Sequence, residues 1–92
     1  MIDSFIHKGL KELFETGETG KVDKHLHARI LRRLDVMHNA KDTKDLNVPG
    51  FDFHPLKGYK PTRYSVHVNG PWCITFEFEN ETATRVDLEQ YH

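Results

Sequence analysis

The chain has 92 residues, a formal net charge of −1 and a single cysteine. Hydrophobic residues make up 37% and aromatic residues 11% of it, enough for a globular core and too much for a disordered chain. We expect one domain over residues 1–92 with a small core, because a chain this short buries only about 60–65% of its unfolded surface. The near-neutral net charge argues against a protein that binds nucleic acid through electrostatic attraction alone. A single cysteine excludes an internal disulfide.

The sequence shows no apolar run of ~18 residues, the length that a membrane-spanning helix needs. Charged residues interrupt its first segment every few positions, so no signal-peptide pattern is present. With one cysteine, these features predict a protein of the reducing cytoplasm that has no membrane partner.

The first quarter of the chain predicts a short strand and then a helix. Residues 1–6 are rich in apolar side chains, and the apolar residues of 8–16 recur at helical spacing. Gly17 is a suitable end for this helix, since glycine readily takes the left-handed conformation. Gly9, near its start, weakens the helix by about 1 kcal/mol relative to alanine.

The strongest helical pattern runs from Asp23, a candidate N-cap, to His38. Apolar residues recur along it at intervals of three and four, which is the spacing of one helix face. We expect this stripe to lie across a sheet; it is formed by Leu26, Ile30, Leu34 and Met37.

The clearest β pattern covers residues 63–78, where β-branched and aromatic residues alternate with polar ones around Asn69-Gly70-Pro71. A two-residue loop at Asn69-Gly70 would mix the two faces of this hairpin. A three-residue loop keeps one face apolar, so we prefer it; it pairs Val68 with Trp72, Val66 with Ile74 and Tyr64 with Phe76. The other face then carries polar side chains, namely Arg63, Ser65, His67, Cys73, Thr75 and Glu77.

The alternation continues after a turn at residues 79–81. Thr84, Val86 and Leu88 extend the apolar face, whereas Arg85, Asp87 and Glu89 extend the polar one. The same parity places Asp87 beside Cys73. Residues 51–54 also alternate and predict a further strand, with Asp52 and His54 opposite its two phenylalanines. The whole pattern predicts an α+β domain, with two N-terminal helices on one face of a small, mainly antiparallel sheet. The opposite face is then open and polar, where a ligand would lie.

Seven histidines make a metal site the first chemistry to weigh. No Cys-x-x-Cys or His-x-x-x-His spacing occurs, so zinc is disfavoured and we expect no metal and no cofactor. Cys73 beside His67 and Asp87 is a conceivable nucleophile, but an ordinary strand cysteine is the better interpretation. Histidines also suit proton transfer near neutral pH. His54 and His67, with lysine and arginine nearby, supply the residue types that ribonucleolytic transesterification needs.

Four segments together resemble the HigB-type toxins of bacterial type II toxin–antitoxin systems, in the RelE-like superfamily. They occur in order and span nearly the whole chain: residues 4–14 (SFIHKGLKELF), 54–58 (HPLKG), 65–76 (SVHVNGPWCITF) and 91–92 (YH). Each motif is short, but their joint occurrence is specific. The resemblance implies a microbial-RNase-type fold over a single RelE/HigB-like toxin domain.

The resemblance also implies an activity and its partners. The expected activity is a ribosome-dependent, metal-independent endoribonuclease that cleaves mRNA in the ribosomal A site and arrests translation and growth. The expected partners are the ribosome, its mRNA and a helix-turn-helix antitoxin of the HigA type. Operator DNA would be contacted only indirectly, through that antitoxin.

Site residues carry over from the family by position. The resemblance makes His54, Lys57, Tyr91 and His92 the expected catalytic residues: His54 or His92 takes the 2′-proton, Lys57 stabilises the transition state and Tyr91 stacks on a base. Arg63 is close in sequence and would assist.

Three departures from the family pattern concern substrate contacts. The family usually has arginine where Cys73 stands, arginine or a similar residue where His67 stands, and aspartate where Gln90 stands. A missing arginine removes a bidentate phosphate partner, a loss that can reach about 10²–10³-fold in rate. Weakened catalysis therefore stays open. The alternative is a toxin homologue that acts mainly as an antitoxin-binding co-regulator of transcription, and a metal-binding regulator is a third, less favoured interpretation.

Overall fold

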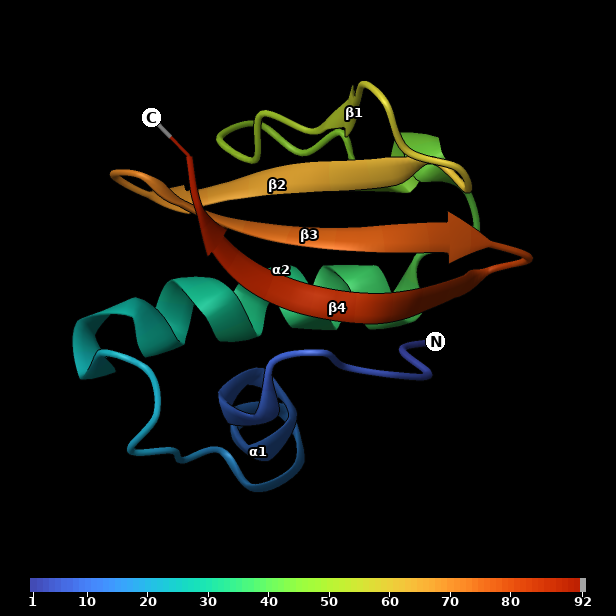
Figure 1. Ribbon diagram of the computed structural model, residues 1–92. Helices are drawn as coiled ribbons and strands as arrows, with labels where there is room; N and C mark the ends of the chain where they lie inside the picture. Colours follow the sequence, from blue (N-terminus) through green and yellow to red (C-terminus); the bar gives the residue numbers. More distant parts are fainter. Residues whose placement is uncertain (92) are drawn as a thin grey trace.

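The computed structural model describes residues 1–91, in which helices pack against a four-stranded sheet (Figure 1). The elements in chain order are α1 (Lys8–Thr16), the 3₁₀ helix η1 (Lys24–Leu26), α2 (His27–Asn39), the 3₁₀ helix η2 (Thr43–Leu46), β1 (His54–Leu56), β2 (Arg63–Asn69), β3 (Trp72–Glu79) and β4 (Thr82–Gln90). The predicted α+β class is confirmed. None of the helices in residues 1–91 has the length and hydrophobicity needed to cross a membrane.

The strands follow one another in the order β1-β2-β3-β4, and each neighbouring pair is antiparallel. The first residues of the chain run beside the outer edge of β4, where Ile2 bridges Ala83 and Phe5 bridges Val86 in parallel. The strand predicted for residues 1–6 is therefore a pair of isolated bridges. These bridges cover the backbone edge that β4 would otherwise expose.

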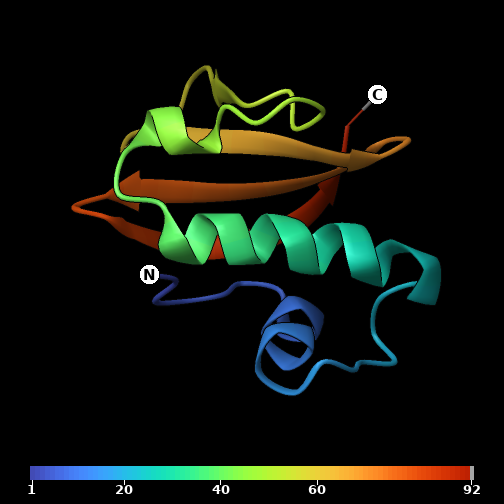
Figure 2. The ribbon, with the colours of Figure 1, turned by 180° about the vertical axis from the view of Figure 1, so that it is seen from behind.

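Helix α2 crosses one face of the sheet, and α1 lies beside α2 at the β4 edge (Figures 1 and 2). The predicted apolar stripe of the second helix is confirmed, because all four of its residues are buried. Asp23 caps η1 rather than α2, and α2 begins at His27. Gly17 ends α1 with a φ of 84°, as predicted. One apolar core therefore fills the space between the helices and the sheet.

The hairpin between β2 and β3 confirms two of the three predicted pairs. Tyr64 lies opposite Phe76 and Val66 opposite Ile74, but Trp72 pairs with Asn69. The predicted pairing of Val68 with Trp72 is wrong, because the register shifts between His67 and Asn69. Val68 is the extra residue and remains buried. A bulge thus allows a shorter loop and an apolar face at the same time.

A second bulge in β4 changes which of its residues face the core. The register shifts between Thr75 and Glu77, and Arg85 takes a left-handed φ of 50° opposite this step. Thr84 consequently pairs with Glu77 on the open face, so its predicted place on the apolar face is wrong. Asp87 pairs with Thr75, and the prediction that Asp87 lies beside Cys73 is also wrong.

The segment before β1 is largely not a strand. Pairing begins at His54, which lies opposite Ser65. Asp52 has a left-handed φ of 47°, and this conformation interrupts the predicted strand over 51–54. Phe51 is buried beneath the guanidinium of Arg33, 4.6 Å from the ring centroid. Packing of the two phenylalanines, not strand alternation, accounts for this apolar pattern.

Candidate functional site

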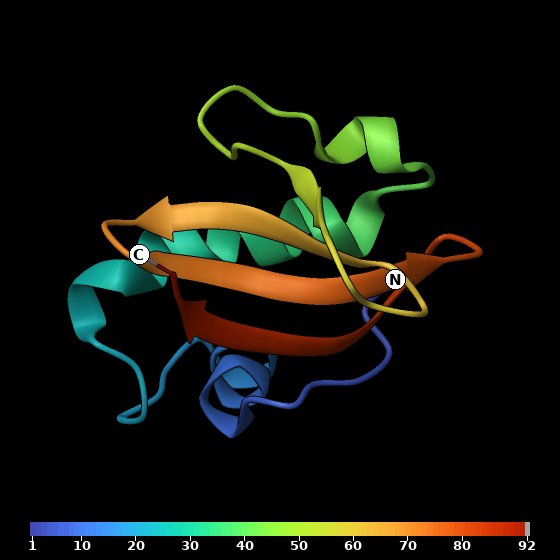
Figure 3. The same ribbon diagram turned by 45° about the horizontal axis from the view of Figure 1, so that its top comes forward.

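The sheet face away from α2 is partly open, because only the 57–62 segment of the described residues crosses it (Figure 3). Residues directly opposite each other in antiparallel strands share a face, so the register arranges the side chains of this face in three rows. The rows run across the sheet as His67–Cys73–Glu89, His54–Ser65–Thr75–Asp87, and Leu56–Arg63–Glu77–Thr84.

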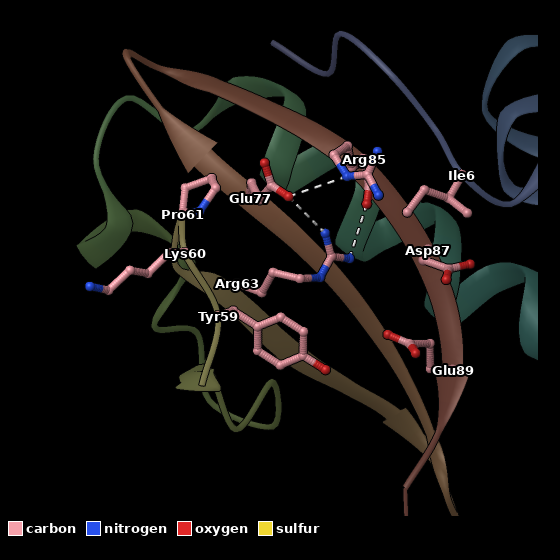
Figure 4. A pocket seen from close by; sticks show the side chains of 9 residues that line it. All are labelled: Ile6, Tyr59, Lys60, Pro61, Arg63, Glu77, Arg85, Asp87 and Glu89. Carbon is pink, nitrogen blue, oxygen red and sulfur yellow. Dashed lines mark hydrogen bonds and ion pairs between the residues drawn. The ribbon is translucent and has the colours of Figure 1, made fainter. Parts of the chain in front are cut away.

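Arg63 lies at the centre of a hydrogen-bonded network on this face (Figure 4). Its Nη1 lies 3.3 Å from Glu77 Oε2, and its Nη2 donates to Thr75 Oγ1 at 3.0 Å and to the Arg85 carbonyl at 3.0 Å. Glu77 Oε2 also lies 3.3 Å from Arg85 Nε. Arg63 is only 8% exposed. Its charge is therefore already paired, and it holds the β4 bulge against the sheet.

A cleft of about 480 Å³ lies between the 59–61 loop and β4, above this network (Figure 4). The loop contributes Tyr59 and Lys60, and β4 contributes Arg85, Asp87 and Glu89. The cleft thus brings together an aromatic ring, cations and carboxylates, a combination that suits a polar ligand with a flat ring.

Glu89 connects this cleft to the end of the chain. Its Oε2 accepts hydrogen bonds from Thr75 Oγ1 and from the Tyr91 hydroxyl, the latter at 3.4 Å. Burial of the phenol, together with the charge of Glu89 and the neighbouring Tyr59, raises the pKa of Tyr91 to about 12. Tyr91 therefore keeps its proton at physiological pH and can donate it in a hydrogen bond.

The ring of His54 is oriented by the turn that precedes it. His54 Nδ1 lies 2.7 Å from the Asp52 carbonyl, which can only accept, so Nδ1 carries the hydrogen. The Nε2 lone pair is then left for a substrate. The side chain is 49% exposed, at the β1 end of the middle row. Asp52, whose carbonyl makes this contact, has a left-handed φ of 47° in the turn.

The other expected catalytic residues lie in different places. Lys57 is exposed in the turn after β1 and does not line the cleft. Tyr91 follows β4, where its backbone N–H donates to the Pro71 carbonyl at 2.7 Å. His92 lies outside the described residues.

The expected substrate-binding residues are only partly brought together. His67 Nε2 lies 3.0 Å from the Gly70 carbonyl, so it donates within its own hairpin. Cys73 lies between His67 and Glu89 in one row, and the conceivable triad with Asp87 is not formed. Gln90 is exposed at the end of β4 opposite Trp72. Among residues 1–91, no group of three or more histidines, cysteines and carboxylates is placed to hold a metal ion.

Sequence reasoning missed five polar residues of the cleft as site candidates: Tyr59, Lys60, Glu77, Arg85 and Glu89. Alternation did place Arg85 and Glu89 on the polar side, which was the available signal. The loop residues gave no periodic signal, because their place follows from how the 57–62 segment crosses the sheet (Figure 3).

Comparison with known proteins identifies the family. A family model described as the RelE-like toxin of the type II toxin–antitoxin system HigB matches residues 3–92. The chain is 42% identical over 92 residues to the endoribonuclease HigB of Proteus vulgaris, covering 100% of both chains. It is 26% identical over 84 residues to an uncharacterised protein of Haemophilus influenzae, covering 89% of this chain and 83% of that protein. The chain therefore belongs to the HigB family of RelE-like toxins of type II toxin–antitoxin systems.

Proposed function

We propose that this toxin is a cytoplasmic, ribosome-dependent and metal-independent endoribonuclease that cleaves mRNA in the A site. The observation that carries the proposal is the 42% identity, over the full length of both chains, to a protein named an endoribonuclease. Its antitoxin is proposed to be a helix-turn-helix protein that also represses the shared operon. With a net charge of −1 the chain has little electrostatic affinity for RNA, so we expect the ribosome to hold the mRNA in place for cleavage.

The proposed chemistry is transesterification within the RNA backbone. The 2′-oxygen attacks the adjacent phosphorus as it loses its proton, and the 5′-oxygen of the next nucleotide leaves as it gains one. His54 is a suitable base, because its Nδ1 is held by the Asp52 carbonyl and its Nε2 remains for substrate. His92 is the partner in proton transfer, and Lys57 stabilises the charge that builds on phosphate. Tyr91 stacks on a base.

One observation favours the alternative function, that of an antitoxin-binding co-regulator with weakened catalysis. Cys73 stands where the family usually has arginine, and its neighbours in the row are His67 and Glu89. With cysteine in place of arginine this row lacks a fixed guanidinium, and its carboxylate would repel a phosphate bound there. The weakened enzyme would still bind its antitoxin.

Primer extension on mRNA bound to purified ribosomes tests the proposal. Wild-type protein should cut at defined A-site positions, and His92→Ala and His54→Ala should each abolish or strongly reduce cutting. His25→Ala is the matched control, because the His25 side chain is 80% exposed and, within residues 1–91, forms an ion pair only with Asp23. If wild type does not cut but still binds its antitoxin, the co-regulator function replaces the nuclease.

A further inference from the structure

The cleft between the 59–61 loop and β4 is distinct from the positions of His54 and Lys57, which do not line it. Its volume of about 480 Å³ lies within the range of small-molecule sites, ~300–1,000 Å³. It adjoins Tyr91 through Glu89, whose Oε2 accepts from the Tyr91 hydroxyl. A strand of RNA that reaches Tyr91 therefore has room for one more nucleotide here.

One end of the cleft presents a fixed cation. The Arg85 side chain is 62% exposed, and Glu77 Oε2 holds its Nε at 3.3 Å. Its backbone is fixed as well, because its N–H donates to Ser4 Oγ at 2.9 Å and its carbonyl accepts from Arg63. A non-glycine residue with a φ of 50° is uncommon, and a β-bulge is one place where it can re-aim a side chain. The bulge thus directs a guanidinium, the preferred partner of a phosphate, to the rim.

The β4 wall at the other end presents hydrogen-bond acceptors. Asp87 Oδ1 accepts from the Leu88 N–H at 2.9 Å, and Glu89 Oε2 accepts from Thr75 and Tyr91. Within residues 1–91 no hydrogen bond engages the second oxygen of either carboxylate. This wall therefore favours a ligand edge made of N–H groups.

An aromatic ring lies across the cleft from these carboxylates. Tyr59 is 47% exposed, although large aromatic side chains are usually well covered. Figure 4 shows its ring on the loop side, with its hydroxyl pointing toward Glu89 on the β4 wall. An exposed ring beside hydrogen-bonding groups is the usual arrangement for stacking an unpaired base.

We propose that this cleft is a one-nucleotide RNA subsite that prefers guanine. This inference rests on the proposed ribonuclease function and deepens it. Arg85 binds the phosphate, Tyr59 stacks on the base, and the free oxygens of Glu89 and Asp87 accept from the base edge. Guanine suits this wall best because its N1–H and N2 amino group donate side by side. Uracil fits worst, because two carbonyl oxygens flank its single N–H.

Binding of 5′-GMP and 5′-UMP to the isolated protein tests the subsite, with the tyrosine ring signals followed by NMR. Wild type should bind GMP roughly tenfold or more tightly than UMP, the discrimination expected of a good bidentate base contact. Glu89→Gln and Asp87→Asn should each reduce that ratio, and Arg85→Gln should weaken both nucleotides equally. Glu79→Gln, an exposed glutamate of β3 outside the cleft, is the control and should change neither.

Equal affinity of the wild type for GMP and UMP overturns the inference, as does a GMP preference that both carboxylate variants retain. Cleavage on ribosomes separates this inference from the proposed function. If wild type cuts mRNA, Glu89→Gln should redistribute the cleavage sites away from guanine. If wild type binds GMP selectively but does not cut, the nuclease proposal fails while the subsite stands.

Discussion

Replacement of Glu77 by glutamine should destabilise the protein by about 2–3 kcal/mol. Glu77 Oε2 lies 3.3 Å from Arg63 Nη1, and the two side chains are 19% and 9% exposed. Removal of one partner from a buried ion pair costs about 3–5 kcal/mol, because the other charge stays buried. We place the cost below that range because glutamine still offers an oxygen and Arg63 keeps its bonds to Thr75 and the Arg85 carbonyl.

Urea unfolding of four proteins measures this effect: wild type, Glu77→Gln, Arg63→Met and the double variant. Residues in contact usually share an interaction energy of about 0.5–3 kcal/mol. The sum of the losses in unfolding free energy of the two single variants should therefore exceed the loss in the double variant. The exposed pair of Glu12 and Lys21, 3.1 Å apart, is the matched control. Glu12→Gln should lower stability much less. If Glu77→Gln lowers it no more than Glu12→Gln does, the buried network does not stabilise the fold as argued.

Three further predictions concern backbone space and protonation. Gly9→Ala should lower the thermal midpoint, at a cost of about 1–3 kcal/mol, because the added Cβ would lie 2.9 Å from Lys21 Cβ; a more stable variant would contradict this packing. Glu89→Gln should lower the pKa of Tyr91 from about 12 without restoring 10.0, because burial is the first cause of the shift. The stability that this tyrosine contributes is present below pH 10.0 and is lost as the pH rises toward 12. An ultraviolet titration of the tyrosines, with Tyr91→Phe as the reference, checks this prediction. The backbone N–H of Lys44, which donates to the Asp42 carboxylate, lowers the pKa of Asp42. The stabilisation from Asp42 is therefore present above pH 3.8 and is lost as the pH falls further. Asp42→Asn, which can still cap the helix, should make the free energy of unfolding depend less on pH in this acid range.

Much of the fold could be predicted because burial imposes a period on the sequence. The apolar positions of α2 recur at helical spacing, and those of β2 and β3 alternate, so both elements and their central register followed directly. The two bulges could not be predicted in this way. A bulge adds one residue and reverses the alternation beyond it, and the contacts that fix the one at Arg85 come from Arg63 and Ser4, distant in the sequence.

Gly9 shows how tertiary packing can reverse a local expectation. Helix propensity favours alanine over glycine by about 1 kcal/mol. In the folded chain, the segment around Lys21 and Val22 passes so close to α1 that an added Cβ meets atoms of both within 3.0 Å. The residue that weakens the isolated helix is therefore the one that lets α1 pack.

The sequence predicted which face of the sheet carries the candidate site, but not the hydrogen bonds and ion pairs between its residues. Alternation placed Arg63, Glu77 and Cys73 on the polar side, and the register confirms all three. Glu77 pairs with both Arg63, which is buried, and Arg85, whose side chain stays exposed. This arrangement depends on the β4 bulge, which the alternation does not predict. Tyr59 reaches the site only through the path of a loop, which carries no periodic signal.

The distribution of charge over the open face connects the departures at Cys73 to the cleft. At Cys73 the row holds His67 and Glu89, so it presents a carboxylate where the resemblance leads us to expect an arginine. An exposed guanidinium lies instead at Arg85, in the bulge of β4. In the proposed complex, the phosphates of RNA are therefore attracted toward the cleft. The Glu89 carboxylate would repel a phosphate but can accept hydrogen bonds from a base. If the proposed subsite binds RNA, Arg85 of β4 makes the phosphate contact that Cys73 of β3 cannot make, and Glu89 remains free to select the base.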